Sequence, residues 1–219
     1  MTRSPLIDST VFLCGAVVMS FEILGSRVLA PNFGTTIFVW GSLISVFLAG
    51  LAAGYFLGGK LADRNPSAKG LALVIMIPAL LFISFPLYHT AVTGWIFRQD
   101  MGERISPLVA SLALFFIPSV LLGAVSPYAV KLRTCSLSSV GHTVGTLYAL
   151  STTGSIAGTL ATSFYLIAVA GVNTLIFYHG ALLLLIAAPL LITRFKCPAA
   201  SLSERARPRT DGDSGSPPS

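Results

Sequence analysis

The sequence predicts an all-α protein: a polytopic integral membrane bundle of six transmembrane helices. Of the 219 residues, 54% are hydrophobic and only 10% are charged, whereas roughly 25% of the residues of an ordinary soluble domain are charged. The apolar residues also gather in six runs, each close to the roughly 20 residues that a helix needs to cross a bilayer. A chain embedded in hydrocarbon needs no polar shell, so both observations indicate that this chain folds in lipid.

Short polar connections separate the six predicted spans, which cover about 11–30, 37–57, 71–92, 107–130, 146–170 and 174–193. The first run is longer than the apolar part of a secretory signal and is read as a retained helix. Residues 1–195 are therefore expected to form one transmembrane domain. Residues 196–219 contain mostly Ser, Pro, Gly, Arg and Asp, and too few apolar residues to fold, so we expect a disordered basic tail.

The basic residues predict the orientation of the chain. Eleven of the 14 Lys and Arg lie before the first span, after the sixth, or in the two connections on that same side. The opposite loops contain only Arg98 and Arg104, and Arg27 lies inside the first span. Positive residues stay on the cytoplasmic side, so both termini are expected in the cytoplasm and the protein in the cell membrane. The net charge of +6 is then explained by the orientation of the chain and by contact with anionic lipid headgroups, and we expect no nucleic-acid partner.

The three cysteines favour a reducing compartment and give no sign of a metal site. Cys14 falls near the cytoplasmic end of the first span, and Cys135 and Cys197 fall in cytoplasmic segments. Their number is odd and their spacing matches no metal-binding pattern. No disulfide, metal or cofactor is expected.

Glycines recur at four-residue spacing in two spans. Gly50, Gly54 and Gly58 lie in the second span, and Gly154 and Gly158 lie in the fifth. Small residues at this spacing let a second helix approach closely, so we expect packing within the chain, with a dimer face as the alternative. Each ladder lies in the middle helix of a set of three spans, and the two sets enter the membrane from opposite sides. This arrangement suggests a 3+3 inverted repeat, as in half of a major facilitator transporter.

Hydroxyl groups and prolines mark the later spans. One face of the fifth span carries Tyr148, Thr152, Ser155, Thr159 and Thr162. This stripe predicts either a wet path or side chains that bond to carbonyls of their own helix at an interface. The third and fourth spans are expected to bend at their prolines, which are Pro78, Pro86, Pro118 and Pro127.

Glu22 is the residue most suggestive of function. At ~1.5 Å per residue it lies about 20 Å deep from the cytoplasmic side. An ionised carboxylate there costs on the order of 2 to 3 kcal/mol, so Glu22 should be protonated, paired or facing a wet cavity. Arg27 is the first candidate partner, although it lies about 140° further round the helix. We predict that Glu22 shares an outward-facing pocket with other polar side chains, the candidate ligand-binding residues being Glu22, Arg27, His179, Tyr165, Tyr148 and Thr152.

The connection after the second span resembles the short cytoplasmic turn between helices two and three of major facilitator transporters. It contains Lys60, Asp63 and Arg64. In that family, charge pairing across the cytoplasmic face helps to hold one conformation. The resemblance implies the same role for this turn. Topology alone also places such charges in a short inner loop.

Four segments together resemble the membrane domain of polytopic spermidine-synthase-like proteins, over about 11–195. They are Phe21-Glu22-Ile23-Leu24 with Arg27; Trp40-Gly41-Ser42 leading to Leu48-Ala49-Gly50-Leu51-Ala52-Ala53-Gly54 and the turn from Lys60 to Arg64; Pro118 with Leu122-Gly123-Ala124 and Ser126-Pro127; and Tyr148-Ala149 with Gly154-Ser155 and Gly158. In that family a soluble aminopropyltransferase domain follows the helices. Here only the short tail follows them, and no soluble catalytic motif is present, so we do not expect an enzyme.

Two functions follow as hypotheses. In the first, the protein is a membrane subunit or anchor for a separate soluble partner, such as an aminopropyltransferase-like subunit. In the second, it is a small-molecule transporter or binding protein, for instance for a polyamine, in which Glu22 neutralises the cationic ligand. Association into a homo-oligomer is compatible with both.

Overall fold

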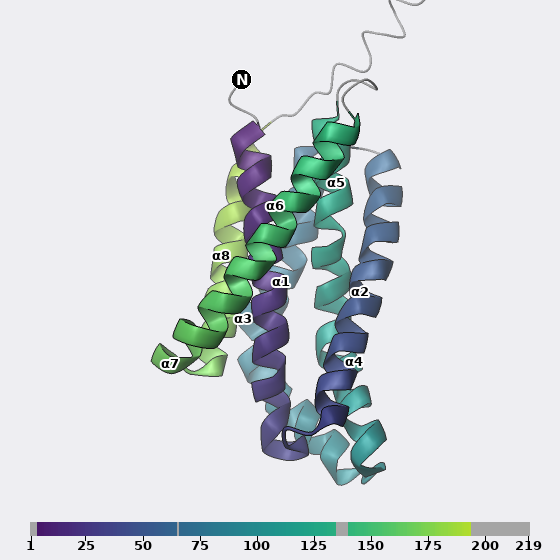
Figure 1. The fold of residues 1–219 in the computed structure, drawn as a ribbon, viewed down its shortest axis with the longest axis vertical. Coiled ribbons are helices and arrows are strands. Elements are labelled where there is room, and N and C mark those ends of the chain that lie inside the picture. The colour runs from purple at the N-terminus through teal and green to yellow at the C-terminus, as the bar shows by residue number, and fades with distance from the viewer. Residues whose placement is uncertain (1–3, 65, 135–139, 194–219) are drawn as a thin grey trace, which may run out of the picture.

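The computed structural model describes residues 4–64, 66–134 and 140–193, and these residues form helices joined by short turns, without a strand. The elements are α1 (Ser4–Phe33), α2 (Ile37–Arg64), α3 (Ala68–Arg98), α4 (Gly102–Gly123), α5 (Val125–Arg133), α6 (Val140–Ala161), the π-helical segment η2 (Thr162–Leu166), α7 (Ile167–Val169) and α8 (Val172–Ile192) (Figure 1). Six helical stretches are long and apolar enough to cross a membrane, with α4 and α5 forming the fourth and α6, η2 and α7 the fifth. The predicted six-helix bundle is confirmed; the predicted tail lies outside the described residues.

The helices form an elongated bundle with two distinct ends. The start of α1, the end of α2, the start of α3 and the last turn of α8 lie at one end, which we call the terminal end (Figure 1). The turns between α1 and α2 and between α3 and α4 lie at the other, which we call the opposite end. In Figure 1, α6, α1 and α2 face the viewer, whereas α3 and α8 lie behind them.

Helix pairing in this bundle follows an internal two-fold pattern. The most extensive contacts join α2 to α4, α1 to α6, and α3 to α8. If the first three spans are exchanged with the last three, the first pair becomes the second and the third maps onto itself. The two sets run in opposite directions, so this pairing supports the predicted inverted repeat.

The glycine ladders lie in the two equivalent interfaces. A Cβ atom added to Gly58 would lie 2.5 Å from the Ala124 carbonyl oxygen, and one added to Gly50 would lie 2.7 Å from Cβ of Ser119. Gly54 likewise has no room for a side chain, because it lies against the Val120 carbonyl oxygen. The first ladder therefore packs α2 against the fourth span inside one chain, as expected.

The second ladder does the same between α6 and α1. A Cβ atom on Gly154 would lie 2.8 Å from the carbonyl carbon of Phe12, and one on Gly158 would lie 2.7 Å from that of Ala16. The intramolecular packing predicted for both ladders is confirmed.

The structure also reveals an internal sequence match that the two ladders bring into register. At a constant separation of 104 residues, five positions of α2 have an identical counterpart in α6: Gly41 with Gly145, Leu43 with Leu147, Gly50 with Gly154, Ala53 with Ala157, and Gly54 with Gly158. Leu43 and Leu147 are both fully buried. The repeat is thus present in sequence as well as in packing.

Aromatic rings fill the centre of the bundle. The Phe21 ring of α1 contacts the rings of Phe47, Phe82, Phe85 and Phe115, at centroid distances of 4.2 to 5.8 Å. These rings come from the first four spans and are almost completely buried. Lipid tails are as apolar as these rings, so dense van der Waals packing, and not exclusion from water, is what favours the association.

The predicted prolines affect the helices unequally. Pro78 and Pro86 lie within the continuous helix α3, and Pro118 lies within α4. Of these two spans, only the fourth is interrupted, between Gly123 and the start of α5. Pro127 explains this interruption, because it lacks an N–H and its ring conflicts with the carbonyl group four residues earlier, which is that of Gly123.

Candidate binding groove between α1 and α2

A small cavity lies where four spans meet in the middle of the bundle. Its walls come from α1, α2, α6 and the junction of α4 and α5, and its lining residues are Cys14, Gly15, Val18, Met19, Leu51, Tyr55, Leu122, Gly123, Ser126, Ser151 and Ser155. Its volume of about 40 Å³ is enough for water. Gly15 faces Ser151, and Gly123 faces Leu51, so each of these glycines brings a helix of one half close to a helix of the other half. The cavity therefore marks the contact between the halves.

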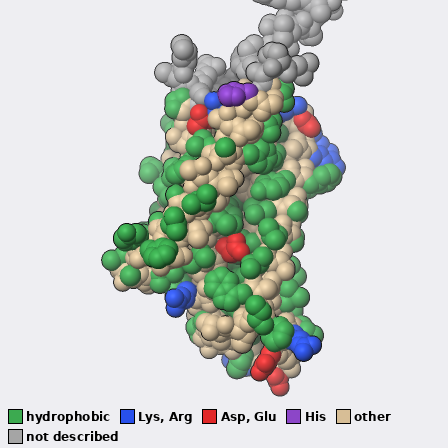
Figure 2. All heavy atoms as spheres, viewed as in Figure 1, with side chains coloured by type: hydrophobic (Ala, Val, Ile, Leu, Met, Phe, Trp, Pro, Cys, Tyr) green, Lys and Arg blue, Asp and Glu red, His purple; other side chains and the backbone are tan. Residues whose placement is uncertain are grey.

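Glu22 lies on the α1 face that lines this cavity. It follows Val18 by four residues and Met19 by three, and residues at these spacings share one face of a helix. The side chain is half-buried, and within the described chain its carboxylate forms no hydrogen bond or ion pair. Figure 2 shows an acidic side chain among apolar ones in the middle of this face. An unpaired carboxylate is thus placed inside an apolar membrane span, where a charge is costly.

Arg27 does not neutralise Glu22. Its side chain is exposed, and among the described residues it takes part in no ion pair. The 140° between the two positions on α1 explains this, because their side chains leave the helix in different directions. Arg27, the first candidate partner, is therefore not paired with Glu22 in the structure.

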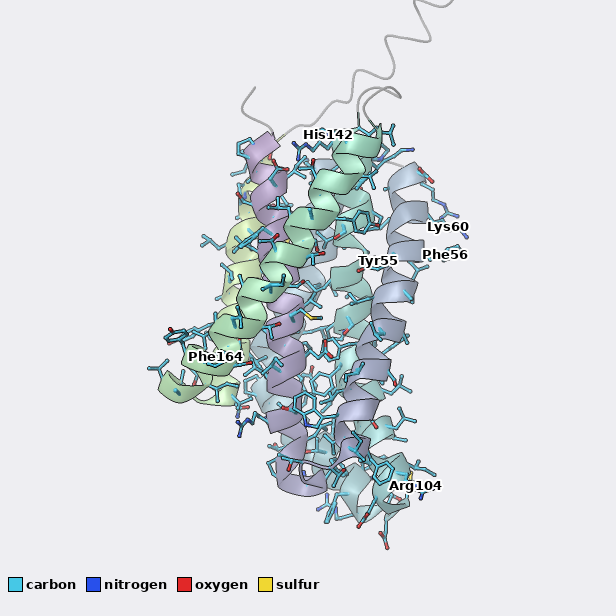
Figure 3. The ribbon with its side chains drawn as sticks, viewed as in Figure 1. Tyr55, Phe56, Lys60, Arg104, His142 and Phe164 are labelled. Atoms are coloured by element: carbon cyan, nitrogen blue, oxygen red, sulfur yellow. The ribbon has the colours of Figure 1, made fainter. Side chains whose placement is uncertain are left out.

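Two tyrosines lie beside the cavity. Tyr55 points from α2 toward α6 (Figure 3), and its ring meets that of Tyr148 edge-on at a centroid distance of 6.4 Å. Tyr148 is 40% exposed. This contact bridges the second and fifth spans, which otherwise touch little.

The predicted hydroxyl stripe of the fifth span mostly satisfies its own helix. Thr152 donates to the Tyr148 carbonyl oxygen at 2.9 Å, and Thr159 donates to that of Ser155 at the same distance. Ser155 also reaches the Gly15 carbonyl oxygen of α1, at 3.2 Å. The second interpretation, bonding to carbonyls of the same helix at an interface, is confirmed for these side chains.

A second polar cluster joins the first, fifth and sixth spans. The Ser20 hydroxyl lies 2.5 Å from that of Thr162 and 2.8 Å from Nε2 of His179, while Nδ1 of His179 lies 2.6 Å from the Leu175 carbonyl oxygen. All three side chains are buried. A carbonyl oxygen only accepts hydrogen bonds, so Nδ1 carries the proton and Nε2 accepts from Ser20, whose oxygen then accepts from Thr162.

The π-helical segment η2 begins at Thr162, the residue that the fifth span contributes to this cluster. A π-turn inserts one residue into the helix and rotates the side chains that follow, and such turns are frequent at functional sites. The sequence pattern placed Thr162 in the hydroxyl stripe but gave no sign of the π-turn or of Ser20 as its partner.

The structure does not bring the six predicted ligand-binding residues into one pocket. Ser20 holds His179 on the side of α1 that faces α8, and Glu22, two residues further, points about 200° away. Tyr165 is 73% exposed on the outer surface. Glu22 and Tyr148 lie beside the cavity, and together with its lining residues Gly15, Tyr55 and Ser126 they define what we call the candidate groove.

Ion pairs link three helices at the terminal end. Lys131 of α5 lies 2.7 Å from Asp63 of α2, and Arg133 of α5 pairs with Asp8 of α1. Lys60 and Arg64 are exposed, and Figure 3 shows Lys60 on the outer side of α2. The predicted turn therefore does pair charges between helices, through Asp63.

The fold and the groove define the class of protein: this is a multi-pass integral membrane protein with six helical spans. No protein-family model, curated protein or solved structure matches the chain. The resemblances to spermidine-synthase-like and major facilitator proteins thus remain predictions.

Proposed function

We propose that this protein binds a small organic cation in the groove between α1 and α2 and carries it across the membrane. The observation that supports this function is Glu22: a half-buried carboxylate in the middle of a span, without a partner among the described residues. A cationic solute would neutralise this charge, and a polyamine, as in the second hypothesis above, has the required chemistry.

The surroundings of Glu22 also favour a carrier. The adjacent cavity lies between two inverted halves, where many transporters bind their substrate, and a helix interruption adjoins it at Gly123. At about 40 Å³ the cavity is far smaller than the roughly 300 Å³ of an ordinary ligand pocket. Binding would therefore require α1 and α2 to separate, at the Tyr55–Tyr148 contact first.

Uptake of labelled spermidine into liposomes that contain the purified protein tests this function. We expect saturable uptake that is lost in Glu22→Gln and kept in Asp63→Asn, which removes the same charge from the terminal end of α2. Uptake that is equal in Glu22→Gln and in the unchanged protein would contradict the proposal. Thermal unfolding in detergent shows that both variants are folded.

A second candidate function is that of a membrane subunit that docks a soluble partner, such as an aminopropyltransferase-like protein. The observation in its favour is the row of exposed cations at the terminal end, Lys60, Arg64 and Lys69, which the charge distribution places in the cytoplasm. Affinity purification under mild detergent tests it. A stoichiometric soluble protein that is lost when the three cations are replaced by Gln, together with no spermidine uptake, would favour this function over the first.

A further inference from the structure

A larger pocket, separate from the Glu22 groove, lies at the opposite end of the bundle. It lies between the α1–α2 turn and the α3–α4 turn, and its volume is about 420 Å³. This volume falls within the roughly 300–1,000 Å³ of pockets that bind small molecules. Its walls combine polar, acidic and aromatic side chains: Asn32, Phe33, Thr36, Phe97, Asp100, Glu103 and Ser106. We call it the outer pocket.

The outer pocket is acidic, and its two carboxylates are not neutralised by a basic side chain of the described chain. Asp100 and Glu103 both line it, and within the described chain neither forms an ion pair. The nearest basic side chains on these elements are Arg98 and Arg104, and neither lines the pocket. The Arg104 guanidinium lies instead over the Phe38 ring, 5.5 Å from its centroid, and Figure 3 shows Arg104 at the outer edge of this end. Two uncompensated carboxylates favour a cationic ligand.

Ser106 provides an independent sign of a ligand. Its side chain is only 6% exposed, yet it lines the pocket and its hydroxyl makes no hydrogen bond to any described residue. The hydroxyl of Ser119 in the same helix, in contrast, donates to the Phe115 carbonyl oxygen. The Ser106 hydroxyl is therefore free to form a hydrogen bond with a ligand in the pocket.

Aromatic rings narrow the class of ligand further. Phe33 and Phe97 meet edge-on, with centroids 6.1 Å apart and an angle of 69° between the ring planes. Phe97 is 54% exposed, so it offers ring surface to a ligand in the pocket. Aromatic faces attract ammonium groups and also pack against an apolar body.

A metal ion fits this pocket poorly. Calcium takes 6–8 oxygen ligands, usually with several carboxylates. The described chain has no group of three or more His, Cys, Asp or Glu side chains that could hold a metal. The volume also far exceeds what a single ion fills.

We propose that the outer pocket binds an organic ammonium ion with an apolar body, its charge held by Asp100 and Glu103, its hydrogen bond made to Ser106, and its body packed on Phe97. This binding does not depend on the function proposed for Glu22. Ten residues of α1 separate Glu22 from Asn32 at the pocket, a rise of about 15 Å. If both proposals hold, the outer pocket is where the solute binds first.

Equilibrium dialysis with radiolabelled 2-phenylethylammonium tests the proposal, on purified protein that carries Glu22→Gln so that the groove does not contribute. We expect saturable binding that weakens at least tenfold in Asp100→Asn/Glu103→Gln. Phe97→Leu should weaken binding by about two- to fivefold, the usual range for a cation–π contact at an exposed site. Asp63→Asn, at the terminal end, should leave binding unchanged.

Three outcomes would overturn the proposal. The first is equal affinity in the double variant. The second is equal affinity for uncharged 2-phenylethanol, which would show an apolar pocket only. The third is binding that is present in the unchanged protein but absent in Glu22→Gln, which would assign the ligand to the groove and support the carrier function alone. Asp100 and Glu103 are exposed, so the double variant should fold, and thermal unfolding in detergent checks this.

Discussion

Replacement of Gly58 by Ala tests whether the first glycine ladder holds α2 against the fourth span. The added Cβ would lie 2.5 Å from the Ala124 carbonyl oxygen, 2.6 Å from its Cα and 2.8 Å from its Cβ. Ordinary contact begins at 3.4 Å, so the two helices must separate locally by about 0.9 Å. A gap of this size forfeits up to about half of the van der Waals attraction of the atoms that line it. Overpacking of this kind costs about 1–3 kcal/mol.

The next residue of the same helix provides a matched control. A Cβ on Gly59 would meet nothing within 4 Å. Gly59→Ala should therefore leave the packing intact and raise stability slightly, by up to about 1 kcal/mol, because Ala loses less backbone freedom than Gly on folding.

Unfolding of the two variants by SDS in mixed micelles, followed by circular dichroism, measures the difference. We expect Gly58→Ala to unfold at a lower SDS fraction than the unchanged protein, and Gly59→Ala at the same or a higher fraction. If the two variants unfold together, close packing at Gly58 does not stabilise the bundle and the assignment of the ladder is refuted.

Three further predictions concern the polar contacts. Solid-state nitrogen NMR should find His179 neutral and protonated at Nδ1, because Nδ1 faces the Leu175 carbonyl oxygen; a proton on Nε2 would refute the order of the hydrogen bonds. Ser20→Ala should lower stability by about 1–3 kcal/mol, measured by the same SDS assay, since Nε2 of His179 loses its donor; an unchanged midpoint would show that the cluster is dispensable. Asp63→Asn should cost less than about 1 kcal/mol, because the Asp63–Lys131 pair is half-exposed or more at both side chains; a loss above 2 kcal/mol would indicate a network that includes more than this pair.

The distribution of apolar residues along the sequence was enough to predict the number and order of the spans. In a membrane every backbone polar group must be satisfied inside its own segment, so an apolar run of the right length has few alternatives to a helix. Close helix packing at the ladders that contain Gly54 and Gly158 was equally predictable, because small residues at four-residue spacing in a membrane helix mainly allow another helix to approach closely. The helix ends lay further out than predicted: α2 continues to Arg64 and α3 to Arg98. The last turns of these helices contain polar residues, so hydropathy does not reveal that the helix continues through them.

The candidate site was only partly predictable. Glu22 was found because an acid in an apolar run is conspicuous, whatever surrounds it. The partner of His179 was not found, because Ser20 lies 159 residues away in sequence and no local pattern links the two. The internal repeat was suggested by span order, but its register emerged only when the structure placed Gly54 and Gly158 at equivalent positions of two equivalent helix interfaces.

The pairing of the helices has a consequence for how the protein is made. Each of the main contacts joins a helix of the first half to one of the second, whereas α1, α2 and α3 touch one another little. When the ribosome has released only the first three spans, these helices can contact one another mainly through the aromatic rings around Phe21. The first half must therefore wait in the bilayer, with the glycine ladder of α2 facing lipid, until the fourth span arrives. A chain truncated before α4 should be a target for membrane quality control, although it contains an intact half of the repeat.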